Sequence, residues 1–440
     1  MSADWNNLRL LQGVYTGSCD AVRAAIEAGA NVNGSPEQPF PPIVAATVIG
    51  DATMVVFLLL FGAEPDTPVD IVLPCPEQFE VTINTVPSER ALHIAARTGD
   101  VEIVRLLLNR AGADPNNTDS RGCTPLTATS QSPDASVEVV RLLLEAGADP
   151  GLGELEGHIP LHGVALNGKM DVFDMLYSRA PSTLNCCSST GQTPLYLACA
   201  GGREAMVSRL LSLGATQPMP PKDGRLCPLF RAVYKDFPGV VRILISEEGI
   251  RAVGGEMAVI HAMNASIRFR RASILPLLLA VDGEERRSKW ANAISRGTSL
   301  LHCGAGYCYP AAVSVLLEAG ADEGARDSQG RVPRDVVGLA VVRNEDEIQR
   351  DRGKEIAIRR MLQRGPACRA RSWAWPCDEI ADAGGGSDGG DTAAADAAVL
   401  ASPPAVKNPP IVGVRIFRQK DKSSSNTFFV KLVERYCAKD

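Results

Sequence analysis

One leucine recurs along this chain at a nearly constant interval, and that period constrains the fold more than any other feature. The intervals are 34, 35, 34 and 34 residues, and the positions are Leu92, Leu126, Leu161, Leu195 and Leu229. A second element also recurs, an apolar run that ends in Ala-Gly-Ala-Asp, as in 137–149 and 313–322. The period predicts a stack of similar units, each of which buries its apolar face against its neighbours.

Local signals within one period predict two helices and a turn. Thr124 is suited to cap a helix, because its hydroxyl can accept from an unpaired N–H of the first turn. Pro125 follows at the first helical position, where a missing N–H costs nothing. The second helix must end at a glycine that accepts a left-handed backbone, and the candidates are Gly112, Gly147 and Gly320.

Segments such as Thr193-Pro194-Leu195 and Ala91-Leu92-His93 resemble the Thr-Pro-Leu-His-x-Ala signature of the ankyrin repeat family. The resemblance covers roughly residues 5–363. It implies an all-α repeat solenoid of helix-turn-helix units with β-hairpin fingers between them. On this basis we expect an ankyrin repeat domain over 1–365, with about nine repeats and a terminal cap.

Three stretches depart from the regular period. Residues 67–86 are a predicted insertion at a hairpin tip, and 79–83 alternate like a strand. A degraded repeat is predicted near 256–290, where Pro276 should disturb the second helix. The cap should occupy 329–363 and contain a charged helix from 344 to 362, since a terminal repeat must face water.

The composition changes after the predicted cap. Residues 366–406 are predicted to be a disordered linker rich in Ala, Gly and Pro, because 378–406 carry six acids and no Lys or Arg. Residues 407–440 form a basic tail with eight Lys or Arg against three acids. Two possible strands in this tail, 411–417 and 427–433, suggest a β-hairpin that needs a partner to become ordered.

Composition excludes several classes of protein. Apolar residues make up 45% and charged residues 22%, which is typical of a globular chain, and the formal net charge of −6 gives no overall attraction to nucleic acid or membrane. We find no apolar run long enough to span a bilayer and no secretory signal. We therefore expect an intracellular monomer, cytoplasmic or nuclear, whose twelve cysteines are reduced thiols.

Histidine is scarce, which limits catalysis. Three of the five histidines, His93, His162 and His302, occupy the signature position, and His261 is predicted to do so as well. The family resemblance implies that this imidazole bonds within and between neighbouring hairpin loops. His158 is interpreted as an exposed loop residue. No histidine is left as an evident general base, and no phosphate-binding loop or nucleophile elbow is present, so we expect no enzymatic activity.

Metal binding has weak support in the sequence. His302, Cys303 and Cys308 are close in the chain, but no second pair of ligands follows them. Cys368 and Cys377 are a second candidate pair, and a packed Trp-rich junction explains them better. The sequence therefore predicts no metal and no cofactor.

A basic cluster at 268–271 precedes Ser273 and allows three interpretations. It resembles a kinase recognition pattern, which would make Ser273 a phosphorylation site. It could also contact nucleic acid or lipid. A plain solvated surface is the favoured interpretation.

The predicted fingers are the candidate contact positions for a partner, because their side chains are not needed for the core. The candidates are Asp119, Arg121, Glu154, Glu156, Thr190, Gln192, Lys222 and Arg225. Their mixed charge suits a protein segment better than a polyanion.

Two functional hypotheses follow. The first is a non-enzymatic scaffold or adaptor that binds a protein through the concave ankyrin surface. The second is a substrate-recruiting subunit of an enzyme complex, such as a ubiquitin-ligase or phosphatase assembly, which docks through residues 407–440.

Overall fold

The computed structural model describes residues 3–35, 40–69, 84–85, 88–217, 227–280, 284–295, 297–339, 345–363 and 412–413. The chain divides into two compact units, unit 1 (Met1–Met206 with Pro410–Asp440) and unit 2 (Val207–Pro409). Each unit is considered separately below.

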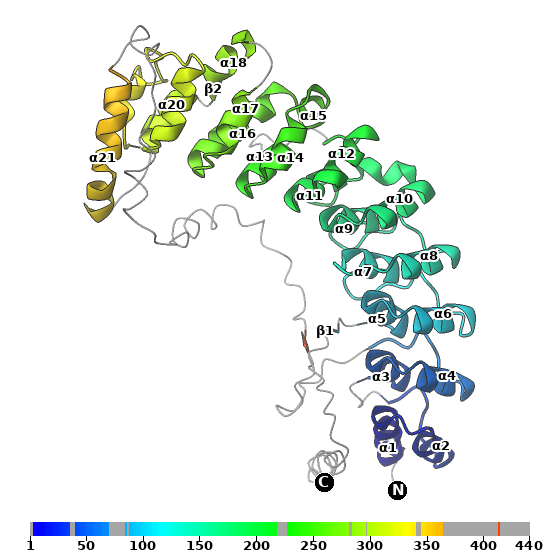
Figure 1. Ribbon diagram of the computed structural model, residues 1–440. Coiled ribbons are helices and arrows are strands. Elements are labelled where there is room, and N and C mark those ends of the chain that lie inside the picture. The colour runs from blue at the N-terminus through cyan, green and yellow to red at the C-terminus, as the bar shows by residue number, and fades with distance from the viewer. Residues whose placement is uncertain are drawn as a thin grey trace. The chain divides into compact units, whose positions relative to one another are not determined.

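Unit 1 is a stack of helical hairpins that follow one another in chain order (Figure 1). Each hairpin pairs a first helix with a second helix. The helices are α1 (Ala3–Thr16), α2 (Cys19–Glu27), α3 (Pro42–Ile49), α4 (Ala52–Leu60), α5 (Ala91–Thr98), α6 (Val101–Asn109), α7 (Pro125–Gln131), α8 (Val137–Glu145), α9 (Pro160–Asn167), α10 (Met170–Arg179), the 3₁₀ helix η1 (Pro181–Asn185) and α11 (Pro194–Ala200).

The hairpins of unit 1 build two layers of helices. First helices pack on first helices, as α5 does on α7, α7 on α9 and α9 on α11, while second helices pack on second helices. The recurring leucines lie in the shared core, and Leu92, Leu126, Leu161 and Leu195 are at most 1% exposed. Burying one such side chain contributes about 1.5–3 kcal/mol. The 34-residue period is therefore the period of the core, as predicted.

The predicted helix signals are confirmed at both ends of the hairpins. The Oγ1 atom of Thr124 accepts from the backbone N–H of Thr127 at 3.2 Å, and Pro125 is the first residue of α7. Gly112 and Gly147 follow second helices with φ of 67° and 91°, values that favour glycine.

Unit 2 continues the same pattern with less regular hairpins (Figure 1). The helix α12 (Glu204–Ser212) includes the residues at which the two units divide. The remaining elements are α13 (Pro228–Tyr234), α14 (Pro238–Leu244), α15 (Glu247–Ala252), α16 (Glu256–Arg268), α17 (Ile274–Leu279), α18 (Glu284–Ala291), β2 (Ile294–Ser295), β3 (Thr298–Ser299), α19 (Leu300–Gly306), α20 (Pro310–Glu318), the 3₁₀ helix η2 (Pro333–Val336) and α21 (Glu345–Met361). First helices α13, α16 and α19 pack in order, as do second helices α14, α17 and α20.

The region predicted as a degraded repeat contains the helix pair α16 and α17, and Pro276 acts differently from the prediction. Pro276 is the third residue of α17, in the first turn, where its missing N–H breaks no intrahelical bond. The helix is consequently short rather than kinked. Two further helices, α15 and α18, were not predicted. Ser246 starts α15 by accepting from the backbone N–H of Gly249 at 3.1 Å.

Other predictions fall partly outside the described residues. The charged cap helix is confirmed as α21. The ends of the insertion meet, because the backbone N–H of Val69 donates to Glu89 O at 2.8 Å and that of Ser88 to Val69 O at 2.8 Å. Several predicted segments lie outside the described residues: the possible strands 79–83 and 427–433, the linker 366–406 and most of the tail. The short strands β1 (Asn84–Thr85) and β4 (Val412–Gly413) pair antiparallel.

Two chemical predictions concern the described part of the chain. Eight cysteines there are free thiols. None of its helices has the length and apolar character needed to traverse a bilayer.

The turn between the two helices of most hairpins uses a left-handed residue. In unit 1 this residue is a glycine, at Gly17, Gly50, Gly99, Gly168 and Gly202, each with φ between 68° and 78°, and the longer connection between α7 and α8 has none. In unit 2 three non-glycine residues adopt the same conformation, and they are Asp236 (φ 63°), Arg270 (φ 54°) and Cys308 (φ 50°). A Cβ atom in this conformation costs roughly 1–2 kcal/mol.

This strain predicts that Arg270→Gly is more stable than Arg270→Ala. Both variants lose the hydrogen bond from the Arg270 side chain to Tyr307 O at 3.2 Å, but only the alanine keeps a Cβ at positive φ. We expect urea titrations to give the glycine variant a free energy of unfolding about 1 kcal/mol higher than that of the alanine variant. Equal stability of the two variants would show that the turn is unstrained.

Candidate functional site

The fingers that join successive hairpins are five-residue turns with one repeated hydrogen-bond pattern. In each, the first residue donates its N–H to the carbonyl of the fifth, and the fourth is a glycine with φ between 75° and 78°. In unit 1 the described fingers are 119–123, 154–158 and 188–192, and in unit 2 there is a finger at 327–331. The side chains of positions one, three and five are therefore held in the same local frame in every finger.

Backbone hydrogen bonds also join neighbouring fingers of unit 1 into what we call the finger ladder. The N–H of Leu155 donates to Arg121 O at 2.8 Å, and the N–H of Ser189 donates to Glu156 O at 2.8 Å. The fingers approach so closely that a Cβ on Gly157 would lie 3.1 Å from the nitrogen of Ser189. The ladder fixes the finger backbone without using the finger side chains.

Buried histidines tie the first helices α5 and α9 to the fingers 119–123 and 188–192, as predicted. The Nδ1 atom of His93 accepts from the N–H of Arg90 at 3.4 Å, and its Nε2 bonds to Cys123 O at 3.0 Å. His162 repeats this arrangement with Ile159 N at 3.2 Å and Gln192 O at 3.0 Å. Burial lowers the pKa of both imidazoles to about 4. They are neutral structural groups near pH 7 and not general bases.

The other two signature assignments have different outcomes. His302 is confirmed, since its ring bonds to the Ser299 hydroxyl at 2.7 Å and to Arg331 O at 2.9 Å. The assignment of His261 stays a prediction: it is the sixth residue of α16, whereas His93, His162 and His302 are each the third residue of their helix. The longer α16 starts earlier in its repeat than the other first helices do.

Asp119 has a structural position among the predicted contact residues. Its side chain is 1% exposed and forms an ion pair with Arg121 at 3.2 Å. The same carboxylate accepts from the backbone N–H groups of Arg121 at 2.8 Å and Cys123 at 2.9 Å. Asp327 in unit 2 has the same role, with bonds from Gln329 N and Arg331 N. Position one of a finger therefore shapes the turn.

The second finger of unit 1 concentrates titratable groups. His158 Nδ1 lies 3.0 Å from Glu154 Oε1 and 3.9 Å from Glu156 Oε2. The side chains of Glu154 and His158 are 14% and 19% exposed, and that of Glu156 is 58% exposed. The interpretation of His158 as an exposed loop residue is therefore wrong, because the finger turn folds it against Glu154.

The charges of this cluster stabilise one another. The hydrogen bond between His158 and Glu154 raises the pKa of the imidazole, although burial acts to lower it. Burial opposes ionisation of Glu154, but hydrogen bonds from His158, Cys123 and Gln131 outweigh it and lower the pKa of this carboxyl. Burial, followed by the charges of Asp119 and Glu154, raises the pKa of Cys123, which stays a thiol and donates to Glu154 Oε2 at 3.1 Å.

The remaining predicted finger residues differ in exposure. Thr190 is exposed and its hydroxyl bonds to that of Ser188 at 2.9 Å. Gln192 is half-buried, with Oε1 3.5 Å from His158 Nε2. Lys222 and Arg225 lie outside the described residues.

Sequence reasoning missed Leu155, which is 77% exposed at the second position of its finger. The corresponding positions of the neighbouring fingers are Ser120 and Ser189, both exposed. A side-by-side alignment of the fingers would have shown that the leucine stands where serine is usual. An apolar side chain of this exposure has no packing role in the repeat.

Glu154, Glu156 and His158 are also the side chains best placed to hold a metal. One ligand atom from each lies within 4.8 Å of the others, and within the described ranges no other group of three such side chains comes as close. His302, Cys303 and Cys308 do not form a ligand set. The His302 ring is taken up by Ser299 and Arg331, and the Cys303 Sγ lies 3.9 Å from the Thr298 hydroxyl.

The basic cluster at 268–271 connects repeats within unit 2. Arg271 donates to Tyr234 O at 2.8 Å and lies 3.4 Å from Asp236, and Arg270 donates to Tyr307 O at 3.2 Å. Arg268 lies over the Phe269 ring at 5.7 Å. Ser273 is exposed at the start of α17. Modification of Ser273 stays a prediction.

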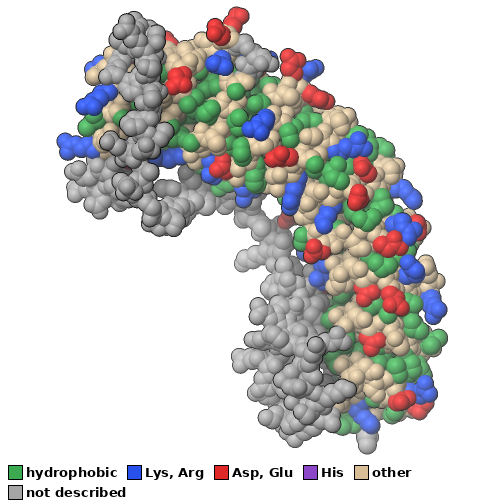
Figure 2. Space-filling view, in the orientation of Figure 1, with side chains coloured by type: hydrophobic (Ala, Val, Ile, Leu, Met, Phe, Trp, Pro, Cys, Tyr) green, Lys and Arg blue, Asp and Glu red, His purple; other side chains and the backbone are tan. Residues whose placement is uncertain are grey.

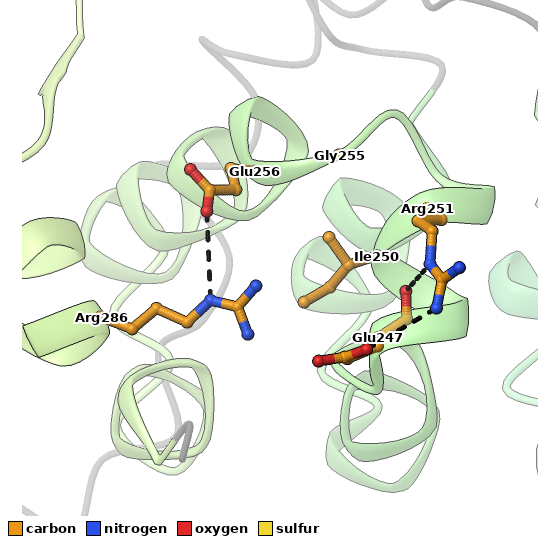
Figure 3. A pocket seen from close by; sticks show the side chains of 6 residues that line it. All are labelled: Glu247, Ile250, Arg251, Gly255, Glu256 and Arg286. Carbon is orange, nitrogen blue, oxygen red and sulfur yellow. Dashed lines mark hydrogen bonds and ion pairs between the residues drawn. The ribbon is translucent and has the colours of Figure 1, made fainter. Parts of the chain in front are cut away.

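A pocket in unit 2 lies among α15, α16 and α18 and has a volume of about 280 Å³ (Figure 3). The Arg286 side chain extends toward Ile250 across this space. Its Nε lies 4.0 Å from Glu256, and Arg251 lies 3.6 Å from Glu247. Because each arginine of the lining already has an acidic neighbour, the pocket offers no concentrated charge for a ligand.

Charges are mixed on the surface as well. Figure 2 shows basic and acidic side chains interspersed on the visible face of each unit. This distribution favours a protein segment with its own mixed charges over a polyanion.

Comparison with known proteins identifies the repeat. A family model described as "Ankyrin repeats (3 copies)" matches two ranges of the chain, residues 43–153 and 161–254. Ankyrin repeats are generally protein–protein interaction modules.

Three relatives are similar to parts of the chain. The ankyrin repeat domain-containing protein SAT10 of Stachybotrys chartarum is 30% identical over 216 residues, which are 48% of this chain and only 10% of that protein. Cyclin-dependent kinase 4 inhibitor B of Mus musculus is 37% identical over 112 residues, 25% of this chain and 82% of the relative. Ankyrin repeat and SOCS box protein 16 of Mus musculus is 31% identical over 170 residues, 35% of each chain.

Loss of the Asp119 carboxylate is predicted to destabilise the finger. Asp119→Ala leaves two finger N–H groups without an acceptor, so we expect the free energy of unfolding to fall by about 2 kcal/mol. Arg121→Ala removes only a partly exposed ion pair and should cost under about 1 kcal/mol. Asp119→Ser should recover part of the loss, because Ser188 accepts from Gln192 N at the same position of the next finger. Equal losses in all three variants would contradict the structural role.

Acid should destabilise the fold through its buried imidazoles. The pKa values of His93 and His162 are about 4 in the folded chain and near 6.5 in the unfolded chain, so the unfolded state binds protons first as the pH falls. Their contribution is complete above about pH 6.5 and is lost toward pH 4, by about 2 kcal/mol per histidine between pH 7 and 5. In His93→Asn the loss of unfolding free energy over this interval should shrink by that amount. If the free energy of unfolding of His93→Asn depends on pH as that of the wild-type chain does, the role of the buried imidazole is refuted.

Proposed function

Because this chain belongs to the ankyrin repeat family, we propose that it is a non-enzymatic scaffold or adaptor that binds a protein partner through the fingers of unit 1. We define the finger face as the exposed finger side chains Ser120, Leu155, Glu156, Ser189 and Thr190 together with the half-buried Arg121. The proposal concerns this face of unit 1.

The observation that carries the proposal is an exposed leucine on a rigid support. Leu155 is 77% exposed, yet its backbone N–H is fixed by the carbonyl of Arg121 at 2.8 Å. Binding at a fixed backbone loses little conformational entropy, because the loop is already ordered before the partner arrives. An apolar centre with a polar rim is also the usual anatomy of a protein interface.

The chemistry around Leu155 suggests the kind of segment that would bind. Glu156 is the most exposed charge beside it, and Thr190 adds a polar rim on the next finger. A partner segment with an apolar side chain for Leu155 and a cation for Glu156 would complement this face. The relative named cyclin-dependent kinase 4 inhibitor B supports a protein as the target, since its name specifies a protein kinase.

The second hypothesis, a substrate-recruiting subunit that docks an enzyme through residues 407–440, remains an alternative. The relative named for ankyrin repeats and a SOCS box shows that such repeats occur together with a further module. In the predicted tail only 412–413 are described, so this docking role stays a prediction. The monomeric state and the cytoplasmic or nuclear location also stay predictions.

The proposal predicts that the finger face can be destroyed without harming the fold. In the double variant Leu155→Asp with Thr190→Arg, both changes are at exposed side chains, so the backbone bonds of the ladder remain. Affinity purification of the full chain followed by mass spectrometry should lose at least one specifically bound protein, by about tenfold or more in abundance.

A matched control is Val137→Asp. This residue is 43% exposed at the start of α8, in the layer of second helices, and should leave the bound proteins unchanged. Identical sets of bound proteins from the double variant, the control and the wild-type chain would contradict binding through the finger face.

A further inference from the structure

We propose that the finger 154–158 binds a zinc ion through Glu154, Glu156 and His158. This site does not depend on the proposed protein partner. The inference starts from one feature of unit 1, the gathering of two carboxylates and one imidazole at positions one, three and five of a single five-residue turn.

The distances allow one ion to reach all three groups. Zinc bonds to imidazole nitrogen and carboxylate oxygen at about 2.0–2.2 Å, so two ligand atoms on a tetrahedral ion are about 3.3–3.6 Å apart. His158 Nδ1 lies 3.0 Å from Glu154 Oε1 and 3.9 Å from Glu156 Oε2, so each pair is within about half an ångström of that spacing. The three ligand atoms fall within 4.8 Å of one another, and a small rotation of the exposed Glu156 side chain closes the remaining gap.

The ligand types favour zinc. An imidazole with two carboxylates is a set that zinc accepts readily, whereas calcium and magnesium prefer oxygen ligands alone. Three protein ligands leave a coordination position open, and the exposure of Glu156 places that position toward solvent. Water would complete the coordination.

Neighbouring side chains aim the ligands at the site. Gln192 Oε1 lies 3.5 Å from His158 Nε2 and accepts the proton there, so zinc would replace only the Nδ1 proton that bonds to Glu154 without the ion. Glu154 Oε2 accepts from Cys123 Sγ at 3.1 Å and from Gln131 at 3.3 Å, which leaves Oε1 for His158 and the ion. Partners of this kind, bonded to the far side of each ligand, orient the ligands of metal sites in proteins.

The backbone under the ligands is fixed by the turn and by the ladder. Glu154 N donates to His158 O at 3.1 Å, which closes the turn. The carbonyl of Glu156 accepts from Ser189 N at 2.8 Å, and Leu155 N donates to Arg121 O. The ligands therefore project from a frame that is already in place, and only side-chain freedom is lost on binding.

The other described fingers have the same frame but lack the ligands. Positions one, three and five are Asp119, Arg121 and Cys123 in one finger, Ser188, Thr190 and Gln192 in the next, and Asp327, Gln329 and Arg331 in unit 2. An arginine or a neutral side chain occupies position three in each of them. The site is therefore specific to 154–158, and these fingers supply residues that the same frame accepts.

Calorimetric titration of the full chain with zinc chloride alone tests the proposal. We expect saturable binding that includes one equivalent assigned to this finger. His158→Gln installs the residue found at position five of the next finger, and Glu156→Gln keeps the size of an exposed side chain. Each variant should weaken the affinity for zinc at this finger by about tenfold or more. Glu102→Gln, which changes an exposed glutamate of α6, should leave it unchanged.

Thiols are the main competing ligands, because Cys187 is exposed and Cys186 is half-buried. The variant Cys186→Ser with Cys187→Ser should retain the finger equivalent. Full retention of zinc binding in His158→Gln and Glu156→Gln, or its loss in the cysteine variant alone, would overturn the proposal. Neither result bears on the Leu155 and Thr190 test, whose readout is bound protein, so the two proposals can fail separately.

Discussion

In the described part of the chain each helical hairpin buries its apolar side chains largely against neighbouring hairpins, and the rest of the structure depends on this shared burial. The helices of unit 1 that pack against each other are mostly seven to ten residues long, too short to be stable alone in water. Leu126 and Leu161 are nonetheless fully buried, because each first helix packs on the next. The buried imidazoles of His93 and His162 then connect the first helices α5 and α9 to a following finger.

Because the core and the backbone hydrogen bonds hold the stack together, most finger side chains are available for recognition. The ladder holds the finger backbone through N–H and C=O groups that every residue possesses, so side-chain identity can vary from finger to finger. In 119–123 the side chains stabilise the turn itself, through Asp119. In 154–158 they gather an exposed leucine, two carboxylates and a histidine. The proposed function and the proposed zinc site both arise at this second finger.

Much of the fold could be predicted from the sequence, because its signals are local and repeated. The caps at Thr124 and Thr193 and the terminating glycines each depend on one or two residues and recur at a fixed spacing. Helix α15 was missed because it is a third helix after α13 and α14, and one period predicts only two.

The candidate site was less predictable. The finger positions could be located from the period, but their burial could not. Asp119 is buried because three donors converge on its carboxylate, and His158 is half-buried because the turn brings it back to Glu154. Such contacts depend on φ at the glycine of each finger and on the neighbouring finger, neither of which a linear motif specifies. The most direct test of the account is amide hydrogen exchange at Leu155 and Ser189, whose N–H groups make the bonds between fingers. If the fingers are one coupled ladder, these amides exchange slowly, at rates close to those of buried amides in α9. Exchange at the rate of an open surface loop would contradict it.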